Sequence, residues 1–131
     1  MNEKKKILYA DDDLDDKTWI VEAWQGVPFP PDITFVDNGR QVLEYLQAKA
    51  QELPALIVLD LNMPELDGRQ TLQKLKADAG LASIPVAIVT TSTSLMDKEV
   101  CKKLGADLFL TKPDLHSDWV GIVQQLETLF S

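Results

Sequence analysis

The feature that most constrains the fold is a fivefold alternation of short apolar runs with longer stretches of helical period. The apolar runs are Ile7 to Ala10, Ile33 to Val36, Ala55 to Leu59, Val86 to Val89 and Leu108 to Leu110. The helical stretches are Leu14 to Gln25, Gly39 to Glu52, Gly68 to Ala79, Leu95 to Leu104 and Leu115 to Phe130. Alternating strands and helices favour right-handed crossovers and a parallel sheet with helices on both faces. The sequence therefore predicts an α/β fold.

The number of strands favours an open sheet. A closed eight-stranded barrel needs about 250 residues, and this chain has 131 residues. We therefore expect a doubly wound, five-stranded parallel sheet. The first, third and fourth apolar runs are almost continuous, as strands buried on both faces are, so we expect them in the centre. One core suffices for a chain of this length, so we expect a single domain over residues 1–131.

Charge and composition exclude several classes of protein. With a net charge of -8, the chain lacks the excess of basic residues expected of a nucleic-acid binder. No apolar run approaches the roughly 20 residues of a membrane span, and the amino terminus lacks the pattern of a signal peptide. A single cysteine, Cys101, rules out an internal disulfide framework. We expect a cytoplasmic protein that binds neither nucleic acid nor a membrane.

Polar side chains follow four of the five apolar runs. They are Asp11-Asp12-Asp13, Asp60-Leu61-Asn62, Thr90-Thr91-Ser92 and Thr111-Lys112-Pro113. Ligands of open parallel sheets bind beyond the carboxyl ends of the strands, where these residues should meet. The sequence therefore predicts a site with several carboxylates, a hydroxyl and an ammonium.

The carboxylates at this edge require a cation. Two of them about 4 Å apart repel by roughly 4 kcal/mol at an effective dielectric of 20. Oxygen donors and remaining water positions suit Mg2+, whereas His116 is the only histidine and cannot build an imidazole site. Lys112 can neutralise an incoming anion that the carboxylates alone would repel. The combination indicates a site for a phosphoryl group.

The stretches ILYADDD, LIVLDLNMPELDG, IPVAIVTTS and GADLFLTKP occur in this order along the chain. Together they resemble the receiver domains of two-component response regulators over essentially the whole length. The resemblance implies a flavodoxin-like fold with strand order 2-1-3-4-5. The TTS stretch and the pair Asp15-Asp16 resemble the stand-alone receivers associated with bacterial phytochromes.

The resemblance also implies roles for individual residues. Asp60 is the phosphoacceptor, and Lys112 and Thr90 contact the phosphoryl group. Asp12 and Asp60 hold Mg2+ through their side chains, Asn62 through its carbonyl and Asp11 through water. Phe109 takes the position of the switching aromatic, whose ring turns inward when Thr90 moves. The Lys112-Pro113 bond is expected to be cis.

The implied function is that of a single-domain response regulator without an output domain. It accepts a phosphoryl group from a sensor histidine kinase or a histidine phosphotransfer protein. Its output is a protein partner in trans, and it can form a homodimer. It is a phosphoacceptor rather than an ordinary enzyme. Two alternatives are a Mg2+-dependent phosphatase of small phosphomonoesters that uses a phosphoaspartate, and a binding module that is never phosphorylated.

Simpler structural roles compete for several of these residues. Asp13, Asp15 and Asp16 are interpreted as residues that favour the positive end of the first helix. Thr90 is equally suited to a strand-end cap, and Phe109 to a place in the core. We interpret Trp19, Trp24 and Trp119 as packing residues, and Cys101 as incidental.

Overall fold

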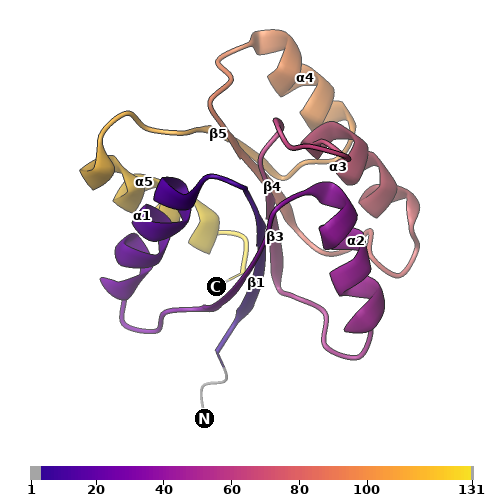
Figure 1. The fold of residues 1–131 in the computed structure, drawn as a ribbon, viewed down its shortest axis with the longest axis horizontal. Coiled ribbons are helices and arrows are strands. Elements are labelled where there is room, and N and C mark those ends of the chain that lie inside the picture. Colours follow the sequence, from indigo (N-terminus) through magenta and orange to yellow (C-terminus); the bar gives the residue numbers. More distant parts are fainter. Residues whose placement is uncertain (1–3, 131) are drawn as a thin grey trace.

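The computed structural model describes residues 4–130, which form a five-stranded parallel sheet between two layers of helices (Figure 1). The strands are β1 (Lys6–Ala10), β2 (Asp32–Val36), β3 (Leu56–Leu59), β4 (Val86–Thr90) and β5 (Leu108–Thr111). The helices are α1 (Leu14–Gln25), α2 (Gly39–Ala48), α3 (Gly68–Ala77), α4 (Leu95–Lys103) and α5 (Trp119–Glu127). The strand order is β2-β1-β3-β4-β5, with every neighbouring pair parallel. The predicted flavodoxin-like α/β fold is confirmed, with β1, β3 and β4 inside the sheet.

Strand alternation divides the apolar side chains between two cores. On one face, Leu8, Ile57 and Ile88 pack with side chains of α2, α3 and α4. On the other, Tyr9, Val58 and Val89 pack with α1 and α5. Successive side chains of a strand point to opposite faces, so each central strand supplies both cores. Figure 1 shows α1 and α5 together on one side of the sheet and α2 and α3 on the other.

Two helices differ from the prediction by more than two residues, whereas α3 and α4 end two residues and one residue before the predicted Ala79 and Leu104. The second helix ends at Ala48 and not at Glu52, because its capping residue Lys49 leaves the helical conformation. The last stretch begins as a short 3-10 turn, His116–Asp118, before α5. Leu129 and Phe130 continue the apolar pattern and pack on the core although they lie beyond α5. Apolar periodicity therefore predicted the burial of these two side chains correctly but overestimated the length of the helix.

Helix α1 begins next to the carboxyl end of β1. Asp13 is its N-cap, and its carboxylate accepts hydrogen bonds from the backbone N–H groups of Asp15 and Asp16. Asp13 therefore lies at the start of the helix, as predicted, and it acts there as the N-cap. The buried face of the helix consists of Asp16, Ile20 and Trp24, which are four residues apart and therefore lie one above the other. Trp24 and Trp119 are buried, as expected of packing residues.

Helix α3 begins in direct contact with the end of β3. The Gly68 N–H donates to the carbonyl of Leu61 at 3.1 Å. A Cβ atom at Gly68 would lie 2.3 Å from the carbonyl oxygen of Asp60. Only glycine allows this approach, so Gly68 fixes the backbone at the candidate phosphoacceptor.

The peptide bond before Pro113 corrects one expectation. The described residues contain no cis peptide bond, so the expected cis Lys112-Pro113 bond is wrong in this structure. Even before proline the trans form is favoured by about 0.5 to 1 kcal/mol. Among the described residues 4–130, no helix is long and apolar enough to cross a bilayer.

Candidate functional site

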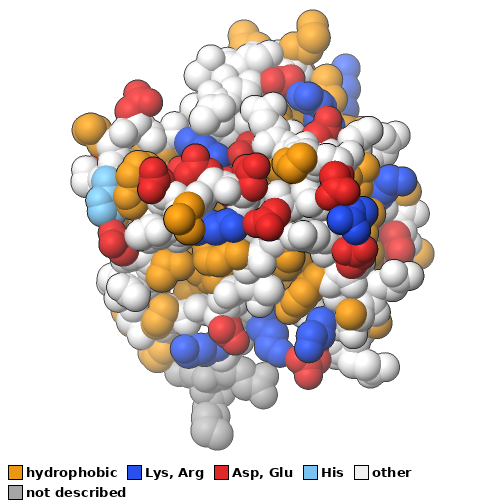
Figure 2. All heavy atoms as spheres, viewed as in Figure 1, with side chains coloured by type: hydrophobic (Ala, Val, Ile, Leu, Met, Phe, Trp, Pro, Cys, Tyr) orange, Lys and Arg blue, Asp and Glu red, His pale blue; other side chains and the backbone are white. Residues whose placement is uncertain are grey.

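The candidate site lies where the loops leave the carboxyl ends of β1, β3, β4 and β5. Figure 2 shows acidic side chains gathered across the middle of this view, with basic side chains among them. Asp11 follows β1 directly, Asp60 follows β3, and Lys112 follows β5. The predicted convergence of these three residues at one edge of the sheet is confirmed by the ion pairs that join them.

Strand parity explains why these three side chains meet. Asp11 and Asp60 are two residues beyond Tyr9 and Val58, which face α1 and α5. Lys112 likewise follows Leu110 on that face. Its Nζ donates a hydrogen bond to Asp60 Oδ2 at 2.8 Å and lies 3.0 Å from Asp11 Oδ2. Asp11 is 0% and Asp60 6% exposed, so water screens this contact little.

Asp16 is a fourth member of this cluster. Its Oδ2 lies 2.5 Å from Lys112 Nζ, and the residue is only 7% exposed. The interpretation of Asp16 as an ordinary helix-start residue is therefore wrong. Asp15, its neighbour, is exposed, which is compatible with that role. The spacing of Asp16 from Ile20 and Trp24 was the sequence signal, because it extends the apolar face of α1 to the site.

The cluster holds more negative than positive charge. Three carboxylates share one ammonium, which leaves a formal excess of two negative charges when all are ionised. Burial raises the pKa of Asp11 to about 6, although the Asp13 N–H and Lys112 favour its charged form. Burial alone lowers the pKa of Lys112, but pairing with Asp16 and Asp60 outweighs it and raises that pKa above the ordinary value. The ammonium therefore stays charged at neutral pH.

The remaining predicted metal ligands lie at the rim. Asp12 is exposed, and so is Asn62, whose backbone N–H donates to Asp60 Oδ1 at 3.3 Å. Within residues 4–130, no three His, Cys, Asp or Glu side chains are arranged to hold a metal ion. The Lys112 ammonium lies among three carboxylates of this cluster. Asp11 Oδ2 and Asp16 Oδ2 are buried without a hydrogen bond, and each forms an ion pair with this ammonium.

Thr90 lies close by but belongs to another set of contacts. It is fully buried, and its Oγ1 accepts a hydrogen bond from the Ser92 N–H at 3.4 Å. Ser92 Oγ donates to Asp97 at 2.7 Å, and Arg69 pairs with the same carboxylate at 2.9 Å. In this conformation the Thr90 hydroxyl is therefore linked to the start of α4 and to α3.

Phe109 and Cys101 lie deeper in the layer of α2, α3 and α4. Phe109 is partly buried and packs against the core on that side of the sheet. This fits the interpretation of Phe109 as a core residue. Cys101 is fully buried in α4, and burial raises the pKa of its thiol, which disfavours the reactive thiolate.

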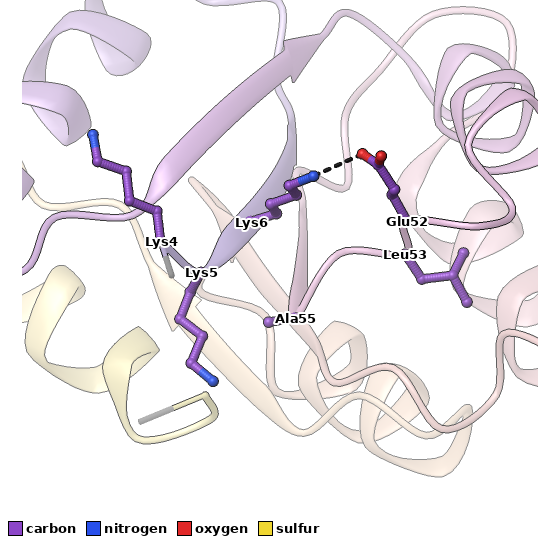
Figure 3. A pocket seen from close by; sticks show the side chains of 6 residues that line it. All are labelled: Lys4, Lys5, Lys6, Glu52, Leu53 and Ala55. Carbon is purple, nitrogen blue, oxygen red and sulfur yellow. Dashed lines mark hydrogen bonds and ion pairs between the residues drawn. The ribbon is translucent and has the colours of Figure 1, made fainter. Parts of the chain in front are cut away.

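A shallow pocket of about 310 Å³ lies at the opposite end of the sheet (Figure 3). It is lined by residues before and at the start of β1 and before β3, namely Lys4, Lys5, Lys6, Glu52, Leu53 and Ala55. Lys6 pairs with Glu52 across it at 2.7 Å, between two well-exposed side chains. Because parallel strands place the carboxylate cluster at their other ends, this pocket is not part of the candidate site.

Comparisons with known proteins agree with this arrangement. Residues 7–123 match the family described as the response regulator receiver domain. The response regulator Rcp1 of Synechocystis sp. is 29% identical over 133 residues, covering 98% of this chain and 90% of Rcp1. The crystal structure of the phosphorylated cyanobacterial phytochrome response regulator RcpA has a TM-score of 0.89 and 32% identity, and the match covers 98% of this chain and 94% of RcpA. The Mn(2+)-bound form of Rcp1 has a TM-score of 0.85 and 30% identity, with 95% and 92% covered.

These matches, which span most of the chain, establish its class. The chain belongs to the response regulator receiver family and is a receiver domain of two-component signalling. The predicted similarity to phytochrome-associated receivers is also confirmed.

Proposed function

We propose that this receiver accepts a phosphoryl group on Asp60 from the phosphohistidine of a histidine kinase or a histidine phosphotransfer protein. An Asp60 carboxylate oxygen attacks phosphorus, the bond from phosphorus to the imidazole nitrogen breaks, and the nitrogen keeps the electron pair. The product is an acyl phosphate on Asp60. The new state then acts through contacts with a downstream protein.

The contact between Asp60 and Lys112 is the observation that carries this proposal. Residues 52 positions apart are brought to 2.8 Å in a site that excludes most water. A charged ammonium at this distance from the nucleophile can pair with an oxygen of the incoming phosphoryl group. Phosphoryl transfer requires mainly such positioning and charge stabilisation.

The donor set suits a hard divalent cation such as Mg2+. Oxygen ligands are its preferred partners, and Asp11 Oδ2 is buried without a hydrogen bond, next to the Lys112 ammonium. Asp12 and Asp60, the Asn62 carbonyl and, through water, Asp11 would hold the ion. When bound, Mg2+ stabilises negative charge on the phosphoryl oxygens. The related response regulator Rcp1 forms crystals in a Mn(2+)-bound form, which supports a divalent cation at this site.

Thr90 and Phe109 are proposed to carry the signal. The Thr90 hydroxyl contacts the phosphoryl group only after it leaves the Ser92 N–H, so phosphorylation stabilises the conformation in which it has moved. Loss of that contact releases the loop that connects Thr90 to Asp97. Leu95 and Met96, at the start of α4, are 78% and 75% exposed, and a partner can recognise them as this loop changes.

The decisive experiment measures intact mass after incubation with acetyl phosphate and Mg2+. Wild type should gain one phosphoryl group, and alkaline hydroxylamine should remove it. Asp60→Asn should gain none, while Asp15→Asn, an exposed aspartate, should behave like wild type. A phosphohistidine on a kinase or phosphotransfer protein is the second donor, because a receiver can reject a small one.

Each remaining outcome has a defined meaning. If neither donor gives an adduct while the chain binds Mg2+, it is a binding module that is not phosphorylated. Sustained turnover of small phosphomonoesters, abolished by Asp60→Asn, would instead identify a phosphatase. Size-exclusion chromatography with and without the adduct tests a phosphorylation-dependent homodimer.

A further inference from the structure

We propose that Asp16 is a positioning residue that competes with the phosphorylated site for the Lys112 ammonium. By holding Lys112 on the α1 side, it limits how tightly the site retains a phosphoryl group on Asp60. This inference rests on the proposed role of Asp60 as phosphoacceptor and adds a residue to that site.

The geometry makes Asp16 a strong competitor. Among the three carboxylates, Asp16 has the shortest contact to Lys112 Nζ, at 2.5 Å, against 2.8 Å for Asp60 and 3.0 Å for Asp11. Its position is fixed by the capped first turn of α1 and by the packing of Ile20 on the same helix face. It is therefore a buried partner, not a mobile surface acid.

The small number of N–H donors on Lys112 makes Asp16 and the phosphoryl oxygens compete for them. A lysine ammonium has three N–H bonds, and three carboxylates contact this one. Because three carboxylates already surround the ammonium, a phosphoryl oxygen pairs with Lys112 either in the place of Asp60 or by drawing the ammonium away from Asp11 and Asp16. Phosphorylation removes the free carboxylate of Asp60, and Asp11 is the proposed water-mediated metal ligand. Asp16 is then the carboxylate left to compete with the phosphoryl oxygens.

The chain offers a matched control for this charge. Asp15 precedes Asp16 on the same first turn of α1, but it is exposed. Asp15→Asn and Asp16→Asn change the net charge equally, and only the second removes a contact with Lys112. The difference between the two variants therefore isolates the buried contact from the overall charge.

The test titrates beryllium fluoride, a tetrahedral mimic of a phosphoryl group on a carboxylate, at saturating Mg2+ with 19F NMR. Asp16→Asn should bind it about tenfold more tightly than wild type, since removing a buried charged partner of the ammonium corresponds to a factor of roughly ten or more. Asp15→Asn should stay within about twofold of wild type. In a Lys112→Gln background, Asp16→Asn should raise the affinity for beryllium fluoride by about twofold or less, because Asp16 and the anion no longer compete for an ammonium.

An unchanged affinity in Asp16→Asn would overturn the proposal. An equal gain in beryllium fluoride affinity with and without Lys112 would also overturn it. That result would mean that the Asp16 carboxylate only repels the anion. Circular dichroism and thermal unfolding establish that the variants are folded, and Asp16→Ala provides a second variant. If wild type neither binds beryllium fluoride nor gains a phosphoryl group on Asp60, the proposed function itself fails. If wild type does both and Asp16→Asn shows no gain, only the role of Asp16 fails.

Discussion

Replacing Asp11 with asparagine should change how the stability of the metal-free protein depends on pH. The folded-state pKa of Asp11 is about 6 against a usual 3.8, because the carboxyl is buried. The folded state therefore binds more protons than the unfolded state between these values, and stability falls as pH rises through this window. A difference of about two pKa units at 1.36 kcal/mol each amounts to about 3 kcal/mol.

The assay is urea unfolding of wild type and Asp11→Asn in EDTA at several pH values. The stability of Asp11→Asn relative to wild type should increase with pH, and about half of the 3 kcal/mol should appear between pH 5 and 7.5. The readout is the slope of the unfolding free energy against pH. The absolute value is less informative, because an asparagine NH2 group facing Lys112 destabilises the protein equally at every pH. Saturating Mg2+ should reduce the difference, since it favours the ionised carboxyl. Parallel stability curves in EDTA would refute the reasoning.

Three further substitutions test other parts of the site. Lys112→Met leaves three buried carboxylates without a cation, so it should destabilise the protein by about 3 to 5 kcal/mol in EDTA, and Mg2+ should recover more stability than it adds to wild type. A melting temperature equal to that of wild type would contradict this. Gly68→Ala places a Cβ 2.3 Å from the Asp60 carbonyl oxygen and should cost about 1 to 3 kcal/mol in urea unfolding while slowing formation of the phosphoryl adduct. Thr90→Ala should still be phosphorylated but show smaller NMR shift changes in α4 than wild type, and equal changes would contradict its coupling role.

The fold could be predicted from sequence because its signals are local and repeated. Five apolar runs alternate with five helical stretches, and the nearly continuous runs at β1, β3 and β4 indicate burial on both faces. The ends of helices were less predictable. Leu129 and Phe130 keep an apolar pattern outside α5, because contact with the core is possible without helical hydrogen bonds. Periodicity reports which side chains are buried and does not report where backbone hydrogen bonds stop.

The candidate site could be predicted only where strands determine it. Asp11, Asp60 and Lys112 follow strands directly, so the sheet alone brings them to one edge. Asp16 comes from a helix, and its place depends on how α1 packs across the sheet. Its spacing from Ile20 was present in the sequence, but an acidic residue in a first helical turn has a simpler explanation in the helix dipole. Tertiary packing decided between the two explanations.

The charge excess at this edge links the stability of the fold to its signalling. Three buried carboxylates share one ammonium, and burial raises the pKa of Asp11, so the ionised form of this carboxyl disfavours the folded state when no other cation is bound. Any ligand that binds only the folded state adds stability of RT ln(1 + [L]/Kd), about 2.7 kcal/mol at one hundred times Kd. In the proposed function, a cation relieves the excess, and a phosphoryl group then draws the ammonium away from the remaining carboxylates. Because Lys112 can serve only some of these partners at once, each binding event changes which contacts hold α1 and β5 to the site.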